Sequence, residues 1–352
     1  MTAISMTAFW EAFTGNMMIF YSLLIGGIVL GVPMAVAAYY SSMFILRGTR
    51  GQGQGSKFKV QGSSIQHPAS SDPVIQSSSI KLPTPPVYTL ITGASSGLGK
   101  EMTIECALQG RNLILVALPG RNMDVLCRTL EKDYGIVAVY YERDLTSREE
   151  IHCLVEDVLA SYRVNFLINN AGIGGTSPFG DSSPDFLEKI IQLNITAVSL
   201  LTRLFLPELK KHPEAHIINV SSMAAFSPFP YKTIYPASKA FVASFSRSLG
   251  EELKETSVKV SVLYPGPILT NPDVTVRIIR QGKNGKRGLL PARILARKAI
   301  NGVAKGKRVI VPGMANKLNR MLMKLLPTTI TVPFLAKVMT REIAETNGTV
   351  VQ

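Results

Sequence analysis

Hydrophobic residues are spaced unevenly along the 352-residue chain, and the first long feature is an uncharged apolar run. No charged side chain occurs between Glu11 and Arg47. A helix rises about 1.5 Å per residue, so an apolar helix over residues 17–46 exceeds the roughly 30 Å hydrocarbon core of a bilayer. We therefore expect a transmembrane helix there. Two alternatives stay open: a buried helix of a soluble protein, and a signal peptide cleaved near residues 35–37, although no basic residues precede the run.

A polar stretch rich in Gly, Ser, Gln and Pro follows at residues 48–86, and it has almost nothing to bury. Such a composition is typical of a flexible linker. Basic residues lie directly after the apolar run, and the positive-inside rule then places the rest of the chain in the cytosol. We expect a single-pass membrane protein with four parts: an N-terminal segment (1–47), the linker (48–86), a globular domain (87–312) and a C-terminal extension (313–352).

From residue 87 onward, short apolar runs alternate with segments of helical periodicity. This alternation predicts βαβ units, and therefore a parallel sheet with helices on both of its faces. The expected strands are residues 87–91, 112–117, 137–141, 166–168, 217–220, 259–263 and 309–312, and the expected helices include residues 100–108, 236–249 and 294–305.

The extension carries a different pattern, in which a helix over residues 314–339 would separate apolar from basic positions. The apolar face comprises Leu318, Met321, Leu322, Leu325 and Leu326, and the basic face comprises Lys317, Arg320 and Lys324. A basic amphipathic helix of this kind is suited to a membrane surface. The alternative is a helix that packs on the globular domain and leaves its basic face in solvent.

The net charge of +14, from 38 Lys and Arg against 24 Asp and Glu, raises nucleic acid as a partner. The excess, however, lies at the flanks: residues 277–341 hold 16 basic and no acidic residues, whereas residues 87–276 hold 17 basic and 20 acidic residues. Apolar residues interleave with the C-terminal basic ones, which favours anionic lipid headgroups over nucleic acid. The three cysteines form no CxxC pair, so we expect neither a disulfide scaffold nor a metal site.

A glycine-rich turn, TGASSGLG over residues 92–99, joins the first expected strand to the first expected helix. Gly93 permits a tight bend, Gly97 lets the backbone approach a pyrophosphate, and Gly99 lets helix and strand pack closely. The start of the helix offers backbone N–H groups to the anion. The turn therefore predicts a dinucleotide site made by Gly93, Ser95, Ser96, Gly97, Leu98 and Gly99.

The end of the second expected strand bears on which dinucleotide binds. An acidic residue there would bind the ribose 2′-hydroxyl of NAD, but residues 116–121 contain none. The 2′-phosphate of NADP needs a cation, for which Lys100 and Arg121 are the candidates. We expect NADP, and NAD stays open.

Further motifs follow in order: NNAG at 169–172, Asn194, Ser222, YPASK at 235–239 and PGPILT at 265–270. Through these landmarks, residues 87–275 resemble the short-chain dehydrogenase/reductase family. The resemblance implies one α/β domain with a single doubly wound, Rossmann-type parallel sheet, and NAD(P)-dependent chemistry on a carbonyl or an alcohol. One departure is Leu118, where many NADP-preferring members of that family have arginine.

Tyr235 and Lys239 are the expected centre of the chemistry. They lie four residues apart at the start of an expected helix, so they share one face. An unperturbed tyrosine is a poor acid at neutral pH, and a nearby ammonium favours its phenolate form. Ser222 lies just beyond an expected strand, where its hydroxyl could polarise the same carbonyl. By resemblance, Asn194 holds a water that relays protons to Lys239, and a purely structural buried amide is the alternative.

The resemblance also assigns contacts with the cofactor. Asp144 would contact the adenine, although a plain helix N-cap is the alternative there. Residues 273–290 lie where the family builds a substrate lid, and a solvated basic loop is equally compatible with them. The other expected cofactor contacts are Asn170, Ala171, Gly172, Tyr235, Lys239, Pro265, Gly266 and Thr270.

We therefore predict a membrane-anchored NADP-dependent oxidoreductase. It would reduce a ketone, or oxidise the secondary alcohol, of a hydrophobic, lipid-like substrate, and the lipid character is inferred only from the anchoring. One alternative is an NAD-dependent alcohol dehydrogenase acting on a small substrate. Another is a catalytically idle dinucleotide-binding scaffold at the membrane. The resemblance leaves a homo-oligomer open.

Overall fold

The computed structural model describes residues 85–268 and 288–346. The expected transmembrane helix (17–46), the linker up to residue 84, Thr270 and nearly all of the loop expected at residues 273–290 lie outside the described residues.

Within the described residues, seven parallel strands form one sheet in the order β3-β2-β1-β4-β5-β6-β7. The strand order reverses between β1 and β4, and at such a switch point a ligand crevice opens beyond the carboxyl ends of the strands. The expected strands are confirmed, with ends that differ by up to three residues: β1 (Val87–Thr92), β2 (Asn112–Ala117), β3 (Ala138–Glu142), β4 (Arg163–Asn169), β5 (Ala215–Val220), β6 (Val258–Leu263) and β7 (Val309–Ile310).

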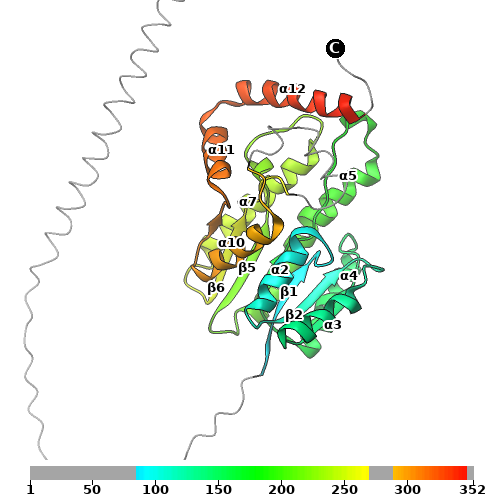
Figure 1. The fold of residues 1–352 in the computed structure, drawn as a ribbon, viewed down its shortest axis with the longest axis vertical. Coiled ribbons are helices and arrows are strands. Elements are labelled where there is room, and N and C mark those ends of the chain that lie inside the picture. Colours follow the sequence, from blue (N-terminus) through cyan, green and yellow to red (C-terminus); the bar gives the residue numbers. More distant parts are fainter. Residues whose placement is uncertain (1–84, 269–287, 347–352) are drawn as a thin grey trace, which may run out of the picture. The chain divides into compact units, whose positions relative to one another are not determined.

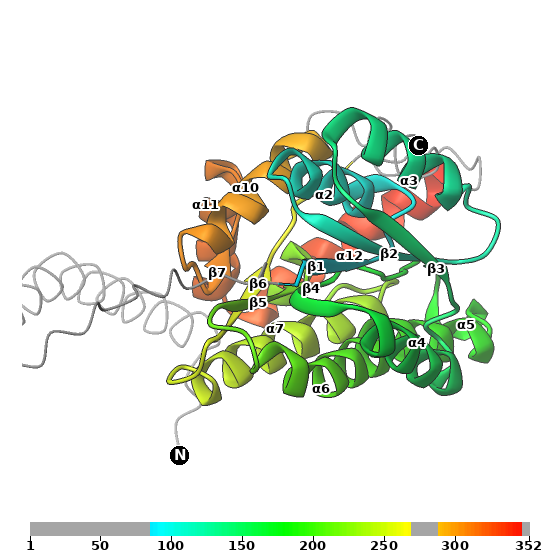
Figure 2. The ribbon, with the colours of Figure 1, turned by 90° about the horizontal axis from the view of Figure 1, so that it is seen from below.

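Helices cover both faces of the sheet, as Figure 2 shows. Successive side chains of a strand point to opposite faces, so Ile91 enters one apolar core and Leu90 enters the other. One face is covered by α2 (Gly97–Leu108), α3 (Met123–Tyr134) and α10 (Ala292–Ala304), and the other by α4 (Arg148–Ser161), α6 (Val198–Leu209) and α7 (Ile234–Glu252).

One described helical stretch, Pro184–Leu209, is long and apolar enough to cross a membrane, with a mean hydropathy of 1.4. It comprises α5 (Pro184–Ile191), a π-helical turn η3 (Gln192–Ala197) and α6. Leu201, Phe205 and Leu209 of α6 are buried against the sheet. This packing accounts for the apolar composition, because α6 is one of the layer helices of the domain.

The C-terminal extension forms two helices, α11 (Met314–Leu325) and α12 (Thr328–Thr346). The expectation of one helix over residues 314–339 is therefore wrong at one point. Leu326 is extended, with φ −80° and ψ 132°, because the residue before a proline avoids the helical region. In Figure 1, α12 lies across the top of the domain and α11 descends from one of its ends. Two short 3-10 turns lie earlier in the chain, η2 (Phe179–Asp181) between β4 and α5, and η4 (Met223–Phe226) between β5 and α7.

Candidate active site

Polar side chains join the carboxyl ends of β1 and β4, where the crevice begins. The buried Thr92 hydroxyl accepts hydrogen bonds from the backbone N–H groups of Asn170 and Ala171, each at 3.0 Å. The Asn170 amide donates to the carbonyl oxygens of Thr92 at 3.0 Å and Gly93 at 3.2 Å. These bonds hold the glycine-rich turn against the NNAG segment, two motifs that are far apart in sequence.

The glycines of the turn have the conformations that a dinucleotide site needs. Gly93 and Gly97 have φ values of 65° and 53°, a region that L side chains rarely adopt. A Cβ added to Gly99 would collide with the carbonyl oxygen of Gly93, so only glycine lets α2 pack this closely on the turn. The Ser96 side chain makes no capping hydrogen bond, and the first turn of α2 carries no acidic side chain. This helix start therefore fits a phosphate. The turn also contains the half-buried Ser95 and the buried Leu98.

The end of β3 forms the part of the crevice where the adenine is expected. The Asp144 carboxylate accepts hydrogen bonds from the backbone N–H of Thr146 at 2.9 Å and from its hydroxyl at 2.8 Å. The alternative that Asp144 caps the next helix is wrong. Ser147 is the N-cap of α4, and its hydroxyl accepts the N–H of Glu150 at 3.2 Å.

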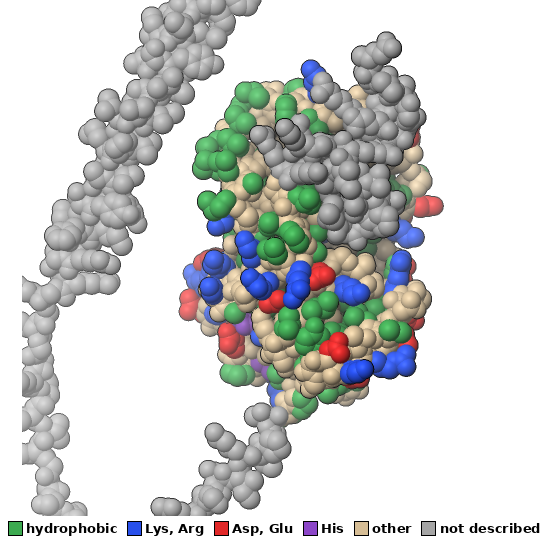
Figure 3. Space-filling model, viewed as in Figure 1, with side chains coloured by type: hydrophobic (Ala, Val, Ile, Leu, Met, Phe, Trp, Pro, Cys, Tyr) green, Lys and Arg blue, Asp and Glu red, His purple; other side chains and the backbone are tan. Residues whose placement is uncertain are grey.

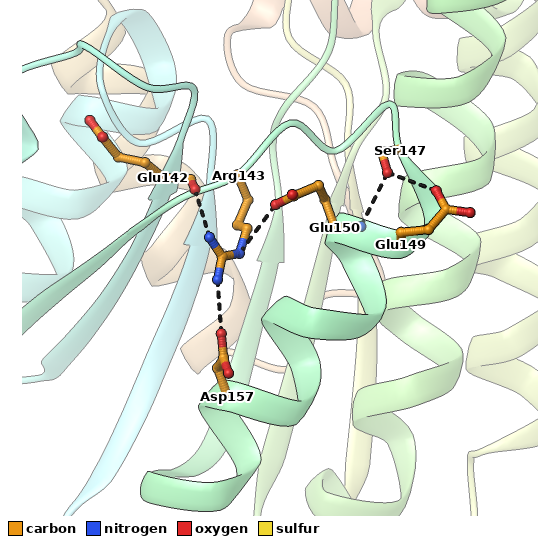
Figure 4. Close-up of polar contacts among 6 residues, drawn as sticks. All are labelled: Glu142, Arg143, Ser147, Glu149, Glu150 and Asp157. Carbon is orange, nitrogen blue, oxygen red and sulfur yellow. Dashed lines mark hydrogen bonds and ion pairs between the residues drawn. The ribbon is translucent and has the colours of Figure 1, made fainter.

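Two charged residues at this edge, drawn in Figure 4, bear on cofactor choice. The Arg143 guanidinium contacts the carboxylates of Asp157 at 2.9 Å and Glu150 at 3.3 Å, so α4 already neutralises this cation. The Glu142 carboxylate accepts the N–H of Gly120 at 3.0 Å in the turn after β2. Strand β3 therefore supplies a carboxylate to a turn whose own residues contain none. This contact was not predicted from the sequence, because only the pairing of β2 with β3 brings the two segments together.

Lys239 is buried on α7, with 4% of its surface exposed. Its Nζ donates to the carbonyl oxygen of Val220 at 3.0 Å, at the carboxyl end of β5. Burial lowers the pKa of Lys239 to about 8. The Ser221 hydroxyl donates to the Lys239 carbonyl at 2.7 Å and is buried. Ser222 is half-buried at the N-cap of η4, where its hydroxyl accepts the N–H of Ala224 at 3.1 Å.

Tyr235 lies one helical turn before Lys239, and both side chains face the loop that follows β4. A Cβ added to Gly174 would lie 2.6 Å from Cδ2 of the Tyr235 ring. A Cβ added to Gly172 would lie 3.0 Å from the Lys239 Nζ. The structure therefore brings the tyrosine and the lysine together against one loop, as their spacing predicts.

Asn194 lies in the π-helical turn η3 and is completely buried. Its amide donates to the Ile173 carbonyl at 2.9 Å and to the Ser238 hydroxyl at 3.0 Å, and its Oδ1 accepts the Ile173 N–H at 3.0 Å. A Cβ added to Gly172 would lie 3.0 Å from both Asn194 Oδ1 and Lys239 Nζ. The amide thus lies beside the lysine and also holds the loop after β4, so its contacts fit both of the roles considered for it.

The segment after β6 carries the last of the expected cofactor contacts. The Pro265 carbonyl accepts the N–H of Met223 at 2.9 Å, which ties this segment to η4. A Cβ added to Gly266 would lie 2.6 Å from the side-chain amide of Asn316 in α11. Asn316 was not predicted from the sequence, where it resembles any other polar position of a basic helix. Gly174 was not predicted either, because no motif marks it.

The chain is similar to dehydrogenases of known sequence. It is 32% identical to 17-beta-hydroxysteroid dehydrogenase type 3 of Homo sapiens over 186 residues, which are 52% of this chain and 59% of that protein. It is 32% identical to very-long-chain 3-oxoacyl-CoA reductase of Anas platyrhynchos over 187 residues, which are 52% of this chain and 60% of that protein. The chain therefore spans about three fifths of the length of the curated relatives it matches.

The fold and the motifs agree with these similarities. A solved short-chain dehydrogenase from Sphingobium yanoikuyae in complex with NADPH is 26% identical, with a TM-score of 0.59, over 68% of this chain and 96% of that chain. The family model described as short chain dehydrogenase matches residues 88–278, which is more than half of the 352 residues. The chain belongs to the short-chain dehydrogenase family.

Proposed function

We propose that the chain is an NADP-dependent oxidoreductase that interconverts a ketone and the secondary alcohol of a hydrophobic substrate. The observation that carries this proposal is the convergence of Tyr235 and Lys239 on the loop after β4, next to the glycine-rich turn. The names of its relatives, a hydroxysteroid dehydrogenase and a very-long-chain 3-oxoacyl-CoA reductase, support a bulky apolar substrate.

Tyr235 is the proposed general acid and base. When bound, the dinucleotide supplies or accepts a hydride at the carbonyl carbon. In reduction the Tyr235 hydroxyl donates its proton to the carbonyl oxygen, while the Ser222 hydroxyl polarises that oxygen. The Lys239 ammonium stabilises the phenolate that remains. Because burial lowers the pKa of Lys239 to about 8, this ammonium exchanges protons readily near neutral pH. Asn194, beside it, is suited to hold the water that returns the proton.

The preference for NADP rests on charge. Residues 116–121 contain no carboxylate, and two cations have exposed side chains: Arg121, in the turn after β2, and Lys100, in the first turn of α2. Glu142 is the observation that favours NAD, because its carboxylate reaches the Gly120 N–H. Affinities for NADPH and NADH, measured side by side by fluorescence titration, decide between the two. Tighter binding of NADH would contradict the proposal.

A Tyr235→Phe variant tests the assignment of the general acid. We expect NADPH affinity to stay nearly unchanged and turnover of a bulky ketone to fall by at least about 100-fold, the usual scale for a lost general acid. The matched control is Tyr140→Phe, at an exposed tyrosine of the edge strand β3. Unchanged turnover in Tyr235→Phe would remove this residue from the mechanism. NADPH binding by a wild-type chain that turns over no ketone or alcohol would favour the scaffold alternative.

We further propose that residues 17–46 anchor the chain by a single span, with the domain at residues 87–312 in the cytosol. The absence of charge in the run and the basic residues after it support this topology. The chain should stay with membranes after alkaline carbonate extraction. Protease added to sealed vesicles whose cytosolic side faces out should digest the domain. Extraction by carbonate, or protection of the domain from protease, would contradict this topology.

A further inference from the structure

Helix α11 exposes its apolar side to solvent, which is unusual for a helix that packs on a soluble domain. Its inward stripe is Asn316, Arg320 and Met323, which are buried or half-buried. Its apolar residues point outward, with Leu318 55% exposed and Leu325 71% exposed. An amphipathic helix of a soluble domain normally places its apolar stripe against the core. Helix α11 has the opposite arrangement, with its apolar stripe exposed and a largely polar stripe facing the domain.

Specific contacts hold this orientation. Asn316 is 2% exposed, and its amide donates to the carbonyl oxygens of Gly288 at 3.0 Å and Pro312 at 2.9 Å. The Arg320 guanidinium lies over the rings of Phe226 at 5.4 Å and Tyr264 at 5.9 Å, within cation–π range. Rolling the helix to bury its leucines would break these hydrogen bonds and ring contacts. The outward leucines are therefore a built feature of the surface.

The exposed apolar surface continues from α11 into the first half of α12. Figure 3 shows hydrophobic side chains gathered over this part of the molecule, at the upper left. Soluble monomers rarely expose apolar patches of this kind unless something binds there. We call this the outer face; its exposed apolar residues are Met314, Leu318, Met321, Leu322, Leu325, Leu326, Ile330 and Phe334.

The charge around the outer face indicates what covers it. Lys317, Lys324 and Lys337 are exposed on the same two helices. No acidic residue occurs anywhere in residues 277–341. A second copy of this chain would bring two basic surfaces together, which is unfavourable, whereas an anionic bilayer has the opposite charge and an apolar interior.

We propose that the outer face docks on an anionic bilayer surface, with its apolar residues at the boundary between headgroups and acyl chains. This contact is separate from the span proposed for residues 17–46. Helix α12, which carries part of the outer face, also packs on the segment between Ser222 and Tyr235: the Ser227 hydroxyl donates to the Thr331 hydroxyl at 3.4 Å, and the Thr340 hydroxyl donates to that of Tyr231 at 3.3 Å. An apolar substrate dissolved in the lipid would then reach the site beside the bilayer; this consequence rests on the proposed function, whereas the docking does not.

Fluorescence quenching by lipid tests the docking in the full chain. The chain has one tryptophan, Trp10, so a Trp10→Phe background carries Leu325→Trp as its only reporter. The matched control is Val125→Trp in the same background, at a 55% exposed apolar position of α3. Both variants are reconstituted in anionic phosphatidylglycerol vesicles with brominated acyl chains. We expect about a twofold or greater loss of emission at position 325, since docked helices lie roughly 5–10 Å deep, and little loss at position 125.

Each outcome decides the proposal. Quenching at position 325 that exceeds the control, and that weakens in zwitterionic vesicles or added salt, supports it. Equal, weak quenching at both positions overturns it. A blue-shifted emission at position 325 that brominated lipid does not quench also overturns it, because another protein surface then covers the outer face. The readout does not depend on turnover, so an inactive chain that is quenched at position 325 refutes the proposed activity and leaves the docking in place.

Discussion

Gly174 is the position at which one added methyl group should disturb the chemistry most directly. The Cβ of an alanine there would lie 2.6 Å from Cδ2, 2.9 Å from Cγ and 3.1 Å from Cε2 of the Tyr235 ring. Carbon atoms in van der Waals contact are about 3.5–4.0 Å apart, so the closest pair must separate by about 1 Å. Either the loop or the ring has to move.

The hydrogen bonds that hold the loop, and the partial exposure of the ring, favour movement of the ring. Ile173, the neighbour of Gly174, has both its N–H and its carbonyl bonded to the buried Asn194 amide, at 3.0 and 2.9 Å. Tyr235 is only half-buried. A displacement of about 1 Å in a catalytic group can cost about 100-fold in rate, because the reacting atoms leave their productive geometry. We therefore expect Gly174→Ala to lower kcat about 100-fold while the affinity for NADPH stays nearly unchanged.

Steady-state kinetics with a saturating ketone, together with NADPH titration, measures both quantities. Gly180→Ala is the matched control, because a Cβ at this nearby glycine of η2 meets no atom within 4 Å. Its kcat should equal that of the wild-type chain. If Tyr235→Phe abolishes turnover but Gly174→Ala keeps the wild-type kcat, then this contact does not set the position of the Tyr235 phenol. An equal loss in Gly180→Ala would assign the effect to the whole loop.

Three further predictions concern stability and cofactor choice. Burial lowers the pKa of Lys239 to about 8, so between about pH 8 and 10.5 the unfolded chain binds more protons than the folded chain. The free energy of unfolding without cofactor should therefore rise by roughly 3 kcal/mol over this pH range. Urea titration of Lys239→Met should lack this rise, and a rise that persists would assign it elsewhere. Asn316→Ala should lower the free energy of unfolding by about 1–3 kcal/mol, since two carbonyl groups lose their donor, whereas the exposed Asn319→Ala should change it little. Arg121→Ala should raise the KM for NADPH by up to about fivefold, the scale of an exposed ion pair, and leave the KM for NADH unchanged; equal effects on both would argue against a phosphate contact.

Local pattern was sufficient to predict most of the sheet. β2 occupies the expected residues, 112–117, because a parallel strand buried on both faces is a continuous apolar run. β4 is longer than the expected residues 166–168, since pairing with β1 extends it over the polar Arg163 and Asn165. The break at Leu326 also has a local cause, the following proline, which the amphipathic pattern obscured.

The candidate site was only partly predictable. Motif spacing placed Tyr235 and Lys239 on one helical face, and their shared loop agrees with that. Motif spacing did not predict that the Lys239 ammonium donates to the Val220 carbonyl. It also did not predict that Ser221 binds the backbone of α7, whereas Ser222 lies at the N-cap of η4. These partners come from neighbouring strands and helices that the sequence does not order in space.

The sequence by itself determined the alternation of strands and helices, the glycine-rich turn and the shared helical face of Tyr235 and Lys239, because each depends on residues within about one helical turn or one strand. Only the tertiary structure decided which side of α11 faces the domain and that the Glu142 carboxylate reaches Gly120. Periodicity shows that a helix has two faces, but the inward one is chosen by its partners. For Asn316 these include the Gly288 carbonyl and the backbone at Gly266, which lie tens of residues away in the chain.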